Sequence, residues 1–279
     1  MLQKKDKTIF DRTEKFLKED FSYTTGNLFG VVQKILEKKG RIEHLTSERM
    51  TPFYIYDEDA LDESIDRFIT VFSKEIPAFR AYYALKINHY FPIVERVLKK
   101  GMGLDVGSVR EINIALKAGC EDMLFFSPGK TDDDIYAALE HADKLRIHID
   151  SFNELRKLGI ITNELGKTIK VGVRIHIGFH DDWKKYGIQI KDLSAFWREA
   201  AKYPHVKLEG IHFHSSRNSD AVFYEKTIRA LGMYLKKSFT RRFPKSNATD
   251  TISVCKYHTS ASPRLSAKKS ASEGTRENP

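Results

Sequence analysis

The strongest constraint on the fold is an alternation that repeats between residues 51 and about 238. Short apolar runs, each the length of a strand, are followed by amphipathic stretches of helical length. This order predicts an α/β fold with a parallel sheet, in which each helix returns the chain to the start of the next strand. Repeats of roughly 20–25 residues are typical of a (β/α)8 TIM barrel. We expect about six strands, hence a partial barrel, at 79–85, 103–106, 123–126, 145–149, 170–176 and 208–214.

Two of the expected helices begin with a capping box, in which a serine oxygen accepts a backbone N–H and a glutamate reaches back to the cap. The boxes consist of Ser108 with Glu111 and of Ser151 with Glu154. Gly119 stands where the glycine that ends a helix belongs. These local signals place helix starts directly after expected strands, as the alternation requires.

The two ends of the chain differ from this central region. Residues 1–50 are charged, with apolar residues at helical spacing, and predict a helical extension. Residues 239–279 are rich in Ser, Thr, Lys and Arg and have no apolar period, so we expect a disordered tail. The expected organisation is therefore an extension (1–50), a barrel domain (51–238) and a tail (239–279).

The formal net charge of +9 does not predict a nucleic-acid surface. Eight basic and three acidic residues after Thr240 put +5 in the tail, and the remaining chain carries only +4. No basic recognition face is left to propose, so no specific nucleic acid is expected. No apolar run approaches the ~18 residues of a membrane span, and the N-terminus lacks the core of a secretory signal. We expect a cytoplasmic protein, because Cys120 and Cys255 give neither a disulfide framework nor a zinc spacing.

Lys86 ends the apolar and aromatic run that starts at Phe79. A buried parallel strand of this kind delivers its last residue to the mouth of a barrel, where barrel enzymes place their catalytic groups. An amine that emerges from apolar surroundings can lose proton affinity and become nucleophilic enough to form a Schiff base. The alternative interpretation is a solvated lysine at a strand end.

The segment Ser127-Pro-Gly-Lys-Thr131 ends like a phosphate-binding loop. That motif needs a further glycine five positions before Gly129, where this chain has Leu124, so a nucleotide P-loop is rejected. The Pro-Gly pair predicts a turn, and Thr131 is expected to cap the helix that follows.

His212 and His214 lie two residues apart on one expected strand, so their side chains point to the same face. This spacing also occurs among metal ligands, with His176 and His180 as possible additions, so a metal-dependent TIM-barrel hydrolase is an alternative. No acidic cluster accompanies the pair, and strand histidines are more often satisfied core residues or stacking groups. No metal is therefore assigned.

Arg174 interrupts an otherwise apolar strand. A buried arginine needs an anionic or hydrogen-bonding partner. That partner is either an internal acid, Asp105 or Asp150, or a bound anionic or polar cofactor. Both acids are expected at the ends of strands, on the rim that carries the chemistry of barrel enzymes, and either could instead cap the next helix.

These segments occur in the order of a known family, and five of them carry the resemblance: Thr51–Asp57, Tyr83-Ala-Leu-Lys-Ile-Asn88, Gly103–Glu111, Phe126-Ser-Pro-Gly-Lys-Thr131 and Lys185-Tyr-Gly-Ile188. They resemble the fold-type III pyridoxal-phosphate enzymes, the family of diaminopimelate, ornithine and arginine decarboxylases, over roughly residues 51–235. The first segment resembles the opening strand of that family. The Pro-Gly-Lys-Thr wording is closer to the diaminopimelate branch than to the ornithine branch.

The resemblance implies a barrel of the alanine racemase type and a pyridoxal-phosphate-dependent carboxy-lyase, most like diaminopimelate decarboxylase. Lys86 would then hold pyridoxal 5'-phosphate as a Schiff base. Asp105 and Arg174 would lie near the cofactor, and His214 would stack against its pyridine ring. The implied partners are a small amino-acid substrate and a second copy or a partner decarboxylase. A racemase-like barrel shares the lysine but not the Pro-Gly-Lys-Thr and Lys-Tyr-Gly-Ile wording.

The chain also departs from the family pattern. After His214 the family continues with an apolar residue, glycine and serine, whereas this chain has Ser215-Ser-Arg217. The match ends near Tyr234, before the glycine-rich phosphate loop, the glutamate for the pyridine nitrogen and the C-terminal β domain of the family. We therefore expect a truncated member with impaired activity. A catalytically inactive paralogue with a binding or regulatory role is the other interpretation.

Overall fold

The computed structural model describes residues 25–48, 52–76, 78–176, 186–214, 221–239 and 251–255. The chain divides into two compact units, residues 1–56 with 258–279 and residues 57–257. In the first unit the structure describes two helices, α2 (Thr25–Glu37) and α3 (Lys39–Glu48). Within the described ranges, no helix is long and apolar enough to cross a membrane.

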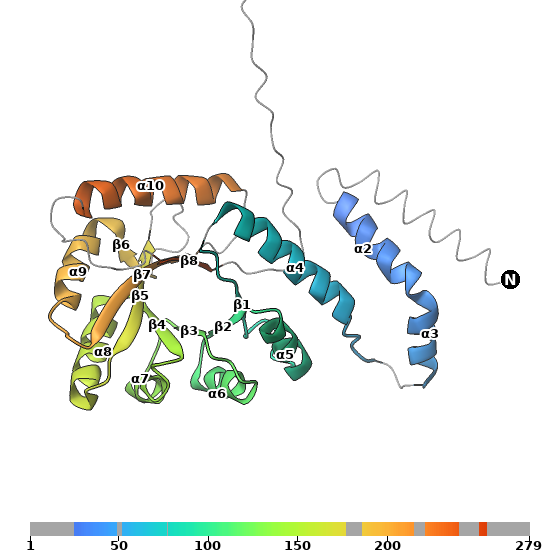
Figure 1. Ribbon diagram of the computed structural model, residues 1–279, viewed down its shortest axis with the longest axis horizontal. Coiled ribbons are helices and arrows are strands. Elements are labelled where there is room, and N and C mark those ends of the chain that lie inside the picture. Colours follow the sequence, from blue (N-terminus) through green and yellow to red (C-terminus); the bar gives the residue numbers. More distant parts are fainter. Residues whose placement is uncertain are drawn as a thin grey trace, which may run out of the picture. The chain divides into compact units, whose positions relative to one another are not determined.

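The second unit is built on an eight-stranded sheet in which every pairing is parallel (Figure 1). Its strands follow the chain order, and β6 pairs with β5 beside the main path. This arrangement confirms the α/β fold class. The strands are β1 (Tyr82–Ala84), β2 (Gly103–Val106), β3 (Met123–Phe126), β4 (Leu145–Ile149), β5 (Ile169–His176), β6 (Ile188–Gln189), β7 (Val206–His214) and β8 (Thr251–Cys255).

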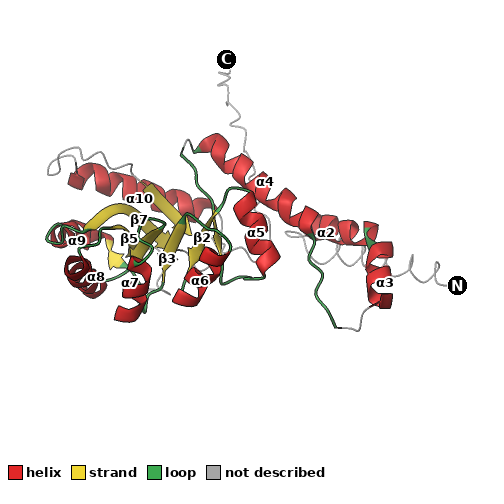
Figure 2. Cartoon of the chain, turned by 60° about the horizontal axis from the view of Figure 1, so that its bottom comes forward, coloured by secondary structure: helices red, strands yellow, loops and turns green. Residues whose placement is uncertain are grey.

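Helices separate the strands and cover the outer face of the sheet, as Figures 1 and 2 show. Helices follow β1, β2, β3, β4, β6 and β7 and return the chain, which is the geometry that a parallel sheet requires. The helices of this unit are α4 (Glu58–Glu75), α5 (Phe91–Lys99), α6 (Val109–Lys117), α7 (Asp132–Leu139), α8 (Phe152–Leu165), α9 (Leu193–Ala200) and α10 (Ala221–Phe239), with a 3-10 turn at Ile190–Asp192 before α9.

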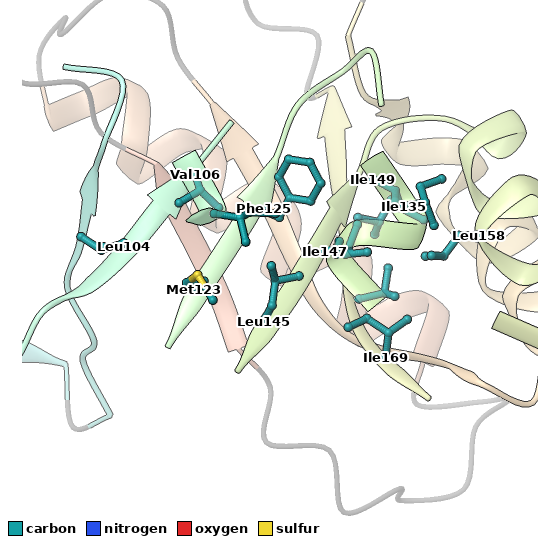
Figure 3. Close-up of a cluster of buried hydrophobic side chains, with 14 of the residues drawn as sticks. Leu104, Val106, Met123, Phe125, Ile135, Leu145, Ile147, Ile149, Leu158 and Ile169 are labelled. Atoms are coloured by element: carbon teal, nitrogen blue, oxygen red, sulfur yellow. The ribbon is translucent and has the colours of Figure 1, made fainter. Parts of the chain in front are cut away.

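Alternate residues of the strands form the core between sheet and helices. Val106, Phe125, Ile147 and Val171 are partners in register on four neighbouring strands, and each is at most 1% exposed. Figure 3 shows such side chains beside Ile135 of α7 and Leu158 of α8. Successive side chains of a strand point to opposite faces, so the remaining strand residues face the inside of the curve.

The sheet curls strongly around that inner face. Phe126 of β3 and His212 of β7 lie with ring centres 4.6 Å apart, although β4 and β5 separate their strands. Three strand spacings along a flat sheet would hold them ~14 Å apart. The inner face is therefore concave and filled by side chains, as in a small barrel.

Three sequence expectations need correction. The sheet has eight strands rather than the expected six or so, because β6 and β8 are short strands outside the expected apolar runs. The disordered tail expected over 239–279 is wrong for Thr251–Cys255, which form β8 in register with β7, and for Phe239, the last residue of α10. In Thr251-Ile-Ser-Val-Cys255 the apolar residues Ile252 and Val254 alternate with smaller side chains, a strand pattern too short to stand out from the polar composition around it. Residues 53–57 form no strand in the structure; Asp57 instead caps α4 by accepting the Ala60 N–H.

The helix caps form with one difference from the expected geometry. Ser108 and Ser151 accept the backbone N–H of Glu111 and Glu154. The two glutamates bond the residue before the cap rather than the cap itself: Glu111 accepts the Gly107 N–H, and Glu154 accepts the Asp150 N–H. Thr131 caps α7 as expected, with a full capping box.

Candidate functional site

The carboxyl ends of the strands form one rim, because all strands run in parallel. Lys86 lies on this rim, exposed, in the turn directly after β1. Asp105 is half-buried within β2 rather than at its end, and its carbonyl oxygen accepts the Leu85 N–H at 2.9 Å. Lys86 therefore follows β1, the strand that pairs with the β2 strand of Asp105, at one edge of the described sheet.

Arg174 is held between two aromatic rings on the inner face. Its guanidinium carbon lies 5.2 Å from the ring centre of Phe126 and 5.0 Å from that of Tyr186. The residue is only 5% exposed. Stacking on two aromatic faces suits a planar cation and restricts its movement. Arg174 is thus a preorganised positive charge within the concave face.

Asp150, directly after β4, is an electrostatic neighbour of Arg174. Burial raises the pKa of its carboxyl group, while the backbone N–H of Gly187 and the charges of Arg174 and Lys130 oppose that rise. Gly187 has a φ of +80°, and a Cβ there would lie 3.0 Å from the backbone of Ile175. Only glycine fits this close approach, which brings the Tyr186 segment against β5.

Two buried histidines line the same face. Burial lowers the pKa of His148 to about 3, and its ring lies where a Cβ on Gly172 would clash at 2.5 Å. His212 is 1% exposed, and burial lowers its pKa well below the usual range. Both rings are therefore neutral at physiological pH. Among the residues that the structure describes, neither ring nitrogen of His212 has a hydrogen-bond partner.

His214 lies two residues beyond His212 on β7, half-buried, and its charge contributes to lowering the pKa of His212. His176 ends β5 and lies 3.5 Å from Gln189, measured between Nδ1 and Nε2. His180, Lys185 and Ser215–Arg217 lie outside the described residues. In the described ranges no group of three or more His, Cys, Asp or Glu could hold a metal ion, so the histidine pair gains no further ligands there.

A buried ion pair that sequence reasoning missed supports the β3 and β4 ends of the rim. The ammonium of Lys130 donates to the carbonyl oxygens of Ser127 and His148, each at 2.7 Å, and to Glu154 Oε1 at 2.6 Å. Burial lowers the pKa of Lys130, and Glu154 opposes that shift. Because Glu154 also accepts the Asp150 N–H, one network fixes the backbone at His148 and Asp150.

The structure gathers the predicted residues in two groups. Arg174, His212 and His214 interact on β5 and β7, with Asp150 beside Arg174. Lys86 and Asp105 form the other group at the β1–β2 edge, linked to the first through the curved sheet. Phe126 and Tyr186 lie in two of the segments that carry the resemblance, but the sequence gives no sign of their contact with Arg174, and His148 lies in an apolar run without a distinctive signal.

Comparison with known proteins assigns the chain to a family. The pyridoxal binding domain of the pyridoxal-dependent decarboxylases matches residues 62–240, more than half of the chain. Diaminopimelate decarboxylase of Neisseria meningitidis serogroup A is 29% identical over 176 residues, which cover 59% of this chain and 43% of that protein. A 2-[(L-alanin-3-ylcarbamoyl)methyl]-2-hydroxybutanedioate decarboxylase of Staphylococcus aureus is 27% identical over 231 residues, or 77% of this chain and 54% of that protein.

Solved structures show the same fold. Diaminopimelate decarboxylase of Helicobacter pylori, complexed with L-lysine, gives a TM-score of 0.61 at 24% identity, covering 70% of this chain and 53% of that one. Lysine/ornithine decarboxylase of Vibrio vulnificus, complexed with cadaverine, gives 0.64 at 21% identity, covering 78% and 56%. The chain spans about half the length of the curated relatives it matches. By its matched domain, its parallel α/β fold and its order of segments, the chain belongs to the pyridoxal-dependent decarboxylases of fold type III.

Proposed function

We propose that this chain forms the cofactor-binding barrel of a pyridoxal-phosphate-dependent amino-acid decarboxylase, with Lys86 as the residue that attaches the cofactor. The observation that carries the proposal is the position of Lys86, an exposed amine directly after β1, on the rim and inside the matched domain. An amine at the rim of a concave, aromatic-lined face can reach an aldehyde bound there. Asp105, Arg174 and His214 are the proposed further contacts.

The described residues fit such a cofactor. Arg174 supplies a fixed positive charge, and the neutral His212 has two buried nitrogens without hydrogen-bond partners in the described structure. Neutral aromatic rings that line a site favour a planar aromatic ligand over an isolated anion. When bound, the cofactor supplies an electron sink for the charge left on carbon after a carboxylate departs.

The residues of the chain would divide the remaining tasks. Lys86 offers its amine for attachment, and Asp105 lies on the adjacent strand, where a carboxylate can influence that amine. Arg174 orients a polar ring substituent, because both aromatic rings hold its guanidinium in place. The rings of Phe126 and His148 fill the inner face and exclude water from it.

The proposed substrate is an amino acid with a second amino group, most like diaminopimelate. Support comes from relatives that are diaminopimelate decarboxylases and from related structures that hold L-lysine and cadaverine. The Staphylococcus aureus relative, whose alignment covers 77% of this chain, makes its carboxylate-rich compound the second candidate. A metal-dependent hydrolase gains no support, because no three-ligand group occurs among the described residues.

The proposal is tested by cofactor attachment before any assay of activity. Purified chain mixed with pyridoxal phosphate should develop a visible absorption band, and borohydride reduction should fix the label on the peptide that contains Lys86. Lys86→Ala should lose both signals. Lys170→Ala is the matched control, because Lys170 is exposed near the opposite end of β5. A colourless wild-type chain, or label spread evenly over surface lysines, would refute the attachment.

Activity is tested separately by release of labelled carbon dioxide. Meso-diaminopimelate, ornithine, arginine, lysine and the Staphylococcus compound should be compared at equal concentration, alone and with a full-length diaminopimelate decarboxylase added. Turnover of one substrate by the chain alone supports the enzyme. Cofactor attachment without turnover of any substrate would instead favour a cofactor-binding paralogue, and sedimentation would show whether it associates with itself or with the added enzyme.

A further inference from the structure

His212 is a buried polar side chain whose ring nitrogens have no hydrogen-bond partner within the described part of the chain. It is 1% exposed, and both ring nitrogens lack a partner among the described residues. A neutral imidazole carries one N–H donor and one acceptor nitrogen. Buried polar groups in native proteins are nearly always hydrogen-bonded, so two unmade bonds on one ring are unusual. An unsatisfied group of this kind either lowers stability for no benefit or awaits a partner.

The surroundings of His212 keep its ring neutral. The ring edge of Phe126 lies 4.6 Å away on β3, and the ring of His148 lies 5.1 Å away on β4. Burial is the main cause that lowers the pKa of His212, and the electrostatic effects of His148, Arg174, His214 and Lys130 lower it further. A neutral imidazole among cations keeps one nitrogen available as an acceptor and the other as a donor.

The position of His212 places it on the ligand side of the sheet. It is the register partner of Arg174 and shares the concave face with His214, two residues further along β7. If the side chain at position 212 only filled space, phenylalanine would be more stable there, because it packs without burying polar atoms. A polar ring at this point therefore has a cost that a ligand contact would offset.

We propose that His212 contacts the molecule bound at this rim and donates or accepts a hydrogen bond with one of its polar atoms. The inference rests on the proposed function, in which that molecule is pyridoxal phosphate. Because neither ring nitrogen exposes surface, binding requires the side chains that cover the His212 ring to move. His212 is then the residue whose unmade bonds are completed on binding.

Three variants test this inference. His212→Phe keeps the ring and removes the polar atoms, whereas His212→Gln keeps a donor and an acceptor. His205→Phe is the matched control, because His205 precedes β7 at the opposite end of the sheet and bonds Thr168. Thermal unfolding without ligand and absorbance titration with pyridoxal phosphate are measured for each.

We expect His212→Phe to unfold at a higher temperature than the wild type without ligand. Its dissociation constant for pyridoxal phosphate should rise roughly tenfold, the factor that one hydrogen bond of ordinary strength implies. His212→Gln should bind within about threefold of the wild type, since half a hydrogen bond is worth that factor. ¹⁵N spectra of the wild type should show a histidine ring nitrogen, absent in His212→Gln, that becomes hydrogen-bonded when the cofactor is added.

Each contrary result has a distinct meaning. If the wild type binds and His212→Phe binds equally well, the inference is wrong and the proposed function stands. If the His212 nitrogens are already hydrogen-bonded without ligand, an internal water or another part of the chain is the partner, and the inference is again wrong. If the wild type does not bind pyridoxal phosphate, both the proposed function and the inference fail.

Discussion

Replacement of Lys130 by methionine tests whether the buried ion pair holds the β3 and β4 ends of the rim. The ammonium has no exposed surface and makes three bonds, to Ser127, His148 and Glu154, at 2.6–2.7 Å. Methionine has a similar length and fills the same space without a charge. The substitution therefore removes the bonds while leaving most of the packing in place.

The expected loss in free energy of unfolding follows from the buried groups that the substitution leaves without a partner. Removing one partner of a buried ion pair costs ~3–5 kcal/mol, because the other charge, here Glu154, stays buried without its countercharge. The carbonyl oxygens of Ser127 and His148 each lose a donor, at ~1–3 kcal/mol for a buried group. These costs are not additive, since all belong to one network. We expect about 5 kcal/mol in the free energy of unfolding, or roughly 10–20 °C in Tm for a domain of this size.

The assay is thermal and urea unfolding followed by circular dichroism. Lys157→Met is the matched control, since Lys157 pairs with Asp132 at 2.7 Å in a mostly exposed bridge and should change stability by less than ~1 kcal/mol. Adding Glu154→Gln to Lys130→Met should recover about 2 kcal/mol by removing the stranded charge. A Tm for Lys130→Met within about 3 °C of that for Lys157→Met would refute the reasoning.

Two further predictions concern pH and packing. The Arg96 hydrogen bond lowers the pKa of Asp62 from 3.8 to about 2, so this pair stabilises the fold above pH 3.8 and the contribution is lost as the pH falls towards 2. The Tm deficit of Asp62→Asn should therefore shrink over that range, and a constant deficit would contradict the assignment. Gly172→Ala should cost ~1–3 kcal/mol in urea unfolding, because its Cβ would meet the His148 ring at 2.5 Å. Gly129→Ala, where a Cβ meets nothing within 4 Å, should be nearly neutral, and equal effects at both glycines would argue against a packing cause.

The regular elements were largely predictable because their signals are local. Three strands occur with the expected bounds: Gly103–Val106, Met123–Phe126 and Leu145–Ile149. The serine caps form as expected, since a cap depends on residues three positions apart. The first strand is shorter than its apolar run, covering only Tyr82–Ala84, because pairing with β2 rather than composition sets where a strand starts.

β8 is a strand that local sequence patterns do not predict. Thr251–Cys255 lie within a polar, Ser-rich stretch and become a strand by pairing along β7, far away in sequence. Pairing with a distant strand can make a short polar segment a β-strand, because its backbone hydrogen bonds form whatever side chains surround them. Five residues are too few for a periodicity to be recognised against that background.

The candidate site also has features that the sequence predicts and features that only the tertiary structure sets. The sequence by itself determined the alternation of strands and helices, the lysine that follows the first strand, the arginine within an apolar run, and the histidine pair on one strand face. These depend on period and order along the chain, which a sequence displays directly.

Only the tertiary structure decided which of these residues meet and what they meet. The bond from Lys130 to Glu154 joins residues 24 positions apart, and the contact of Arg174 with the Phe126 and Tyr186 rings joins three separate segments of the chain. Phe126 of β3 lies against His212 of β7 because the sheet curls, and within the described residues the buried ring nitrogens of His212 have no hydrogen-bond partner. Burial and contact between distant strands are properties of that curvature, and burial sets the cost of every polar group it covers.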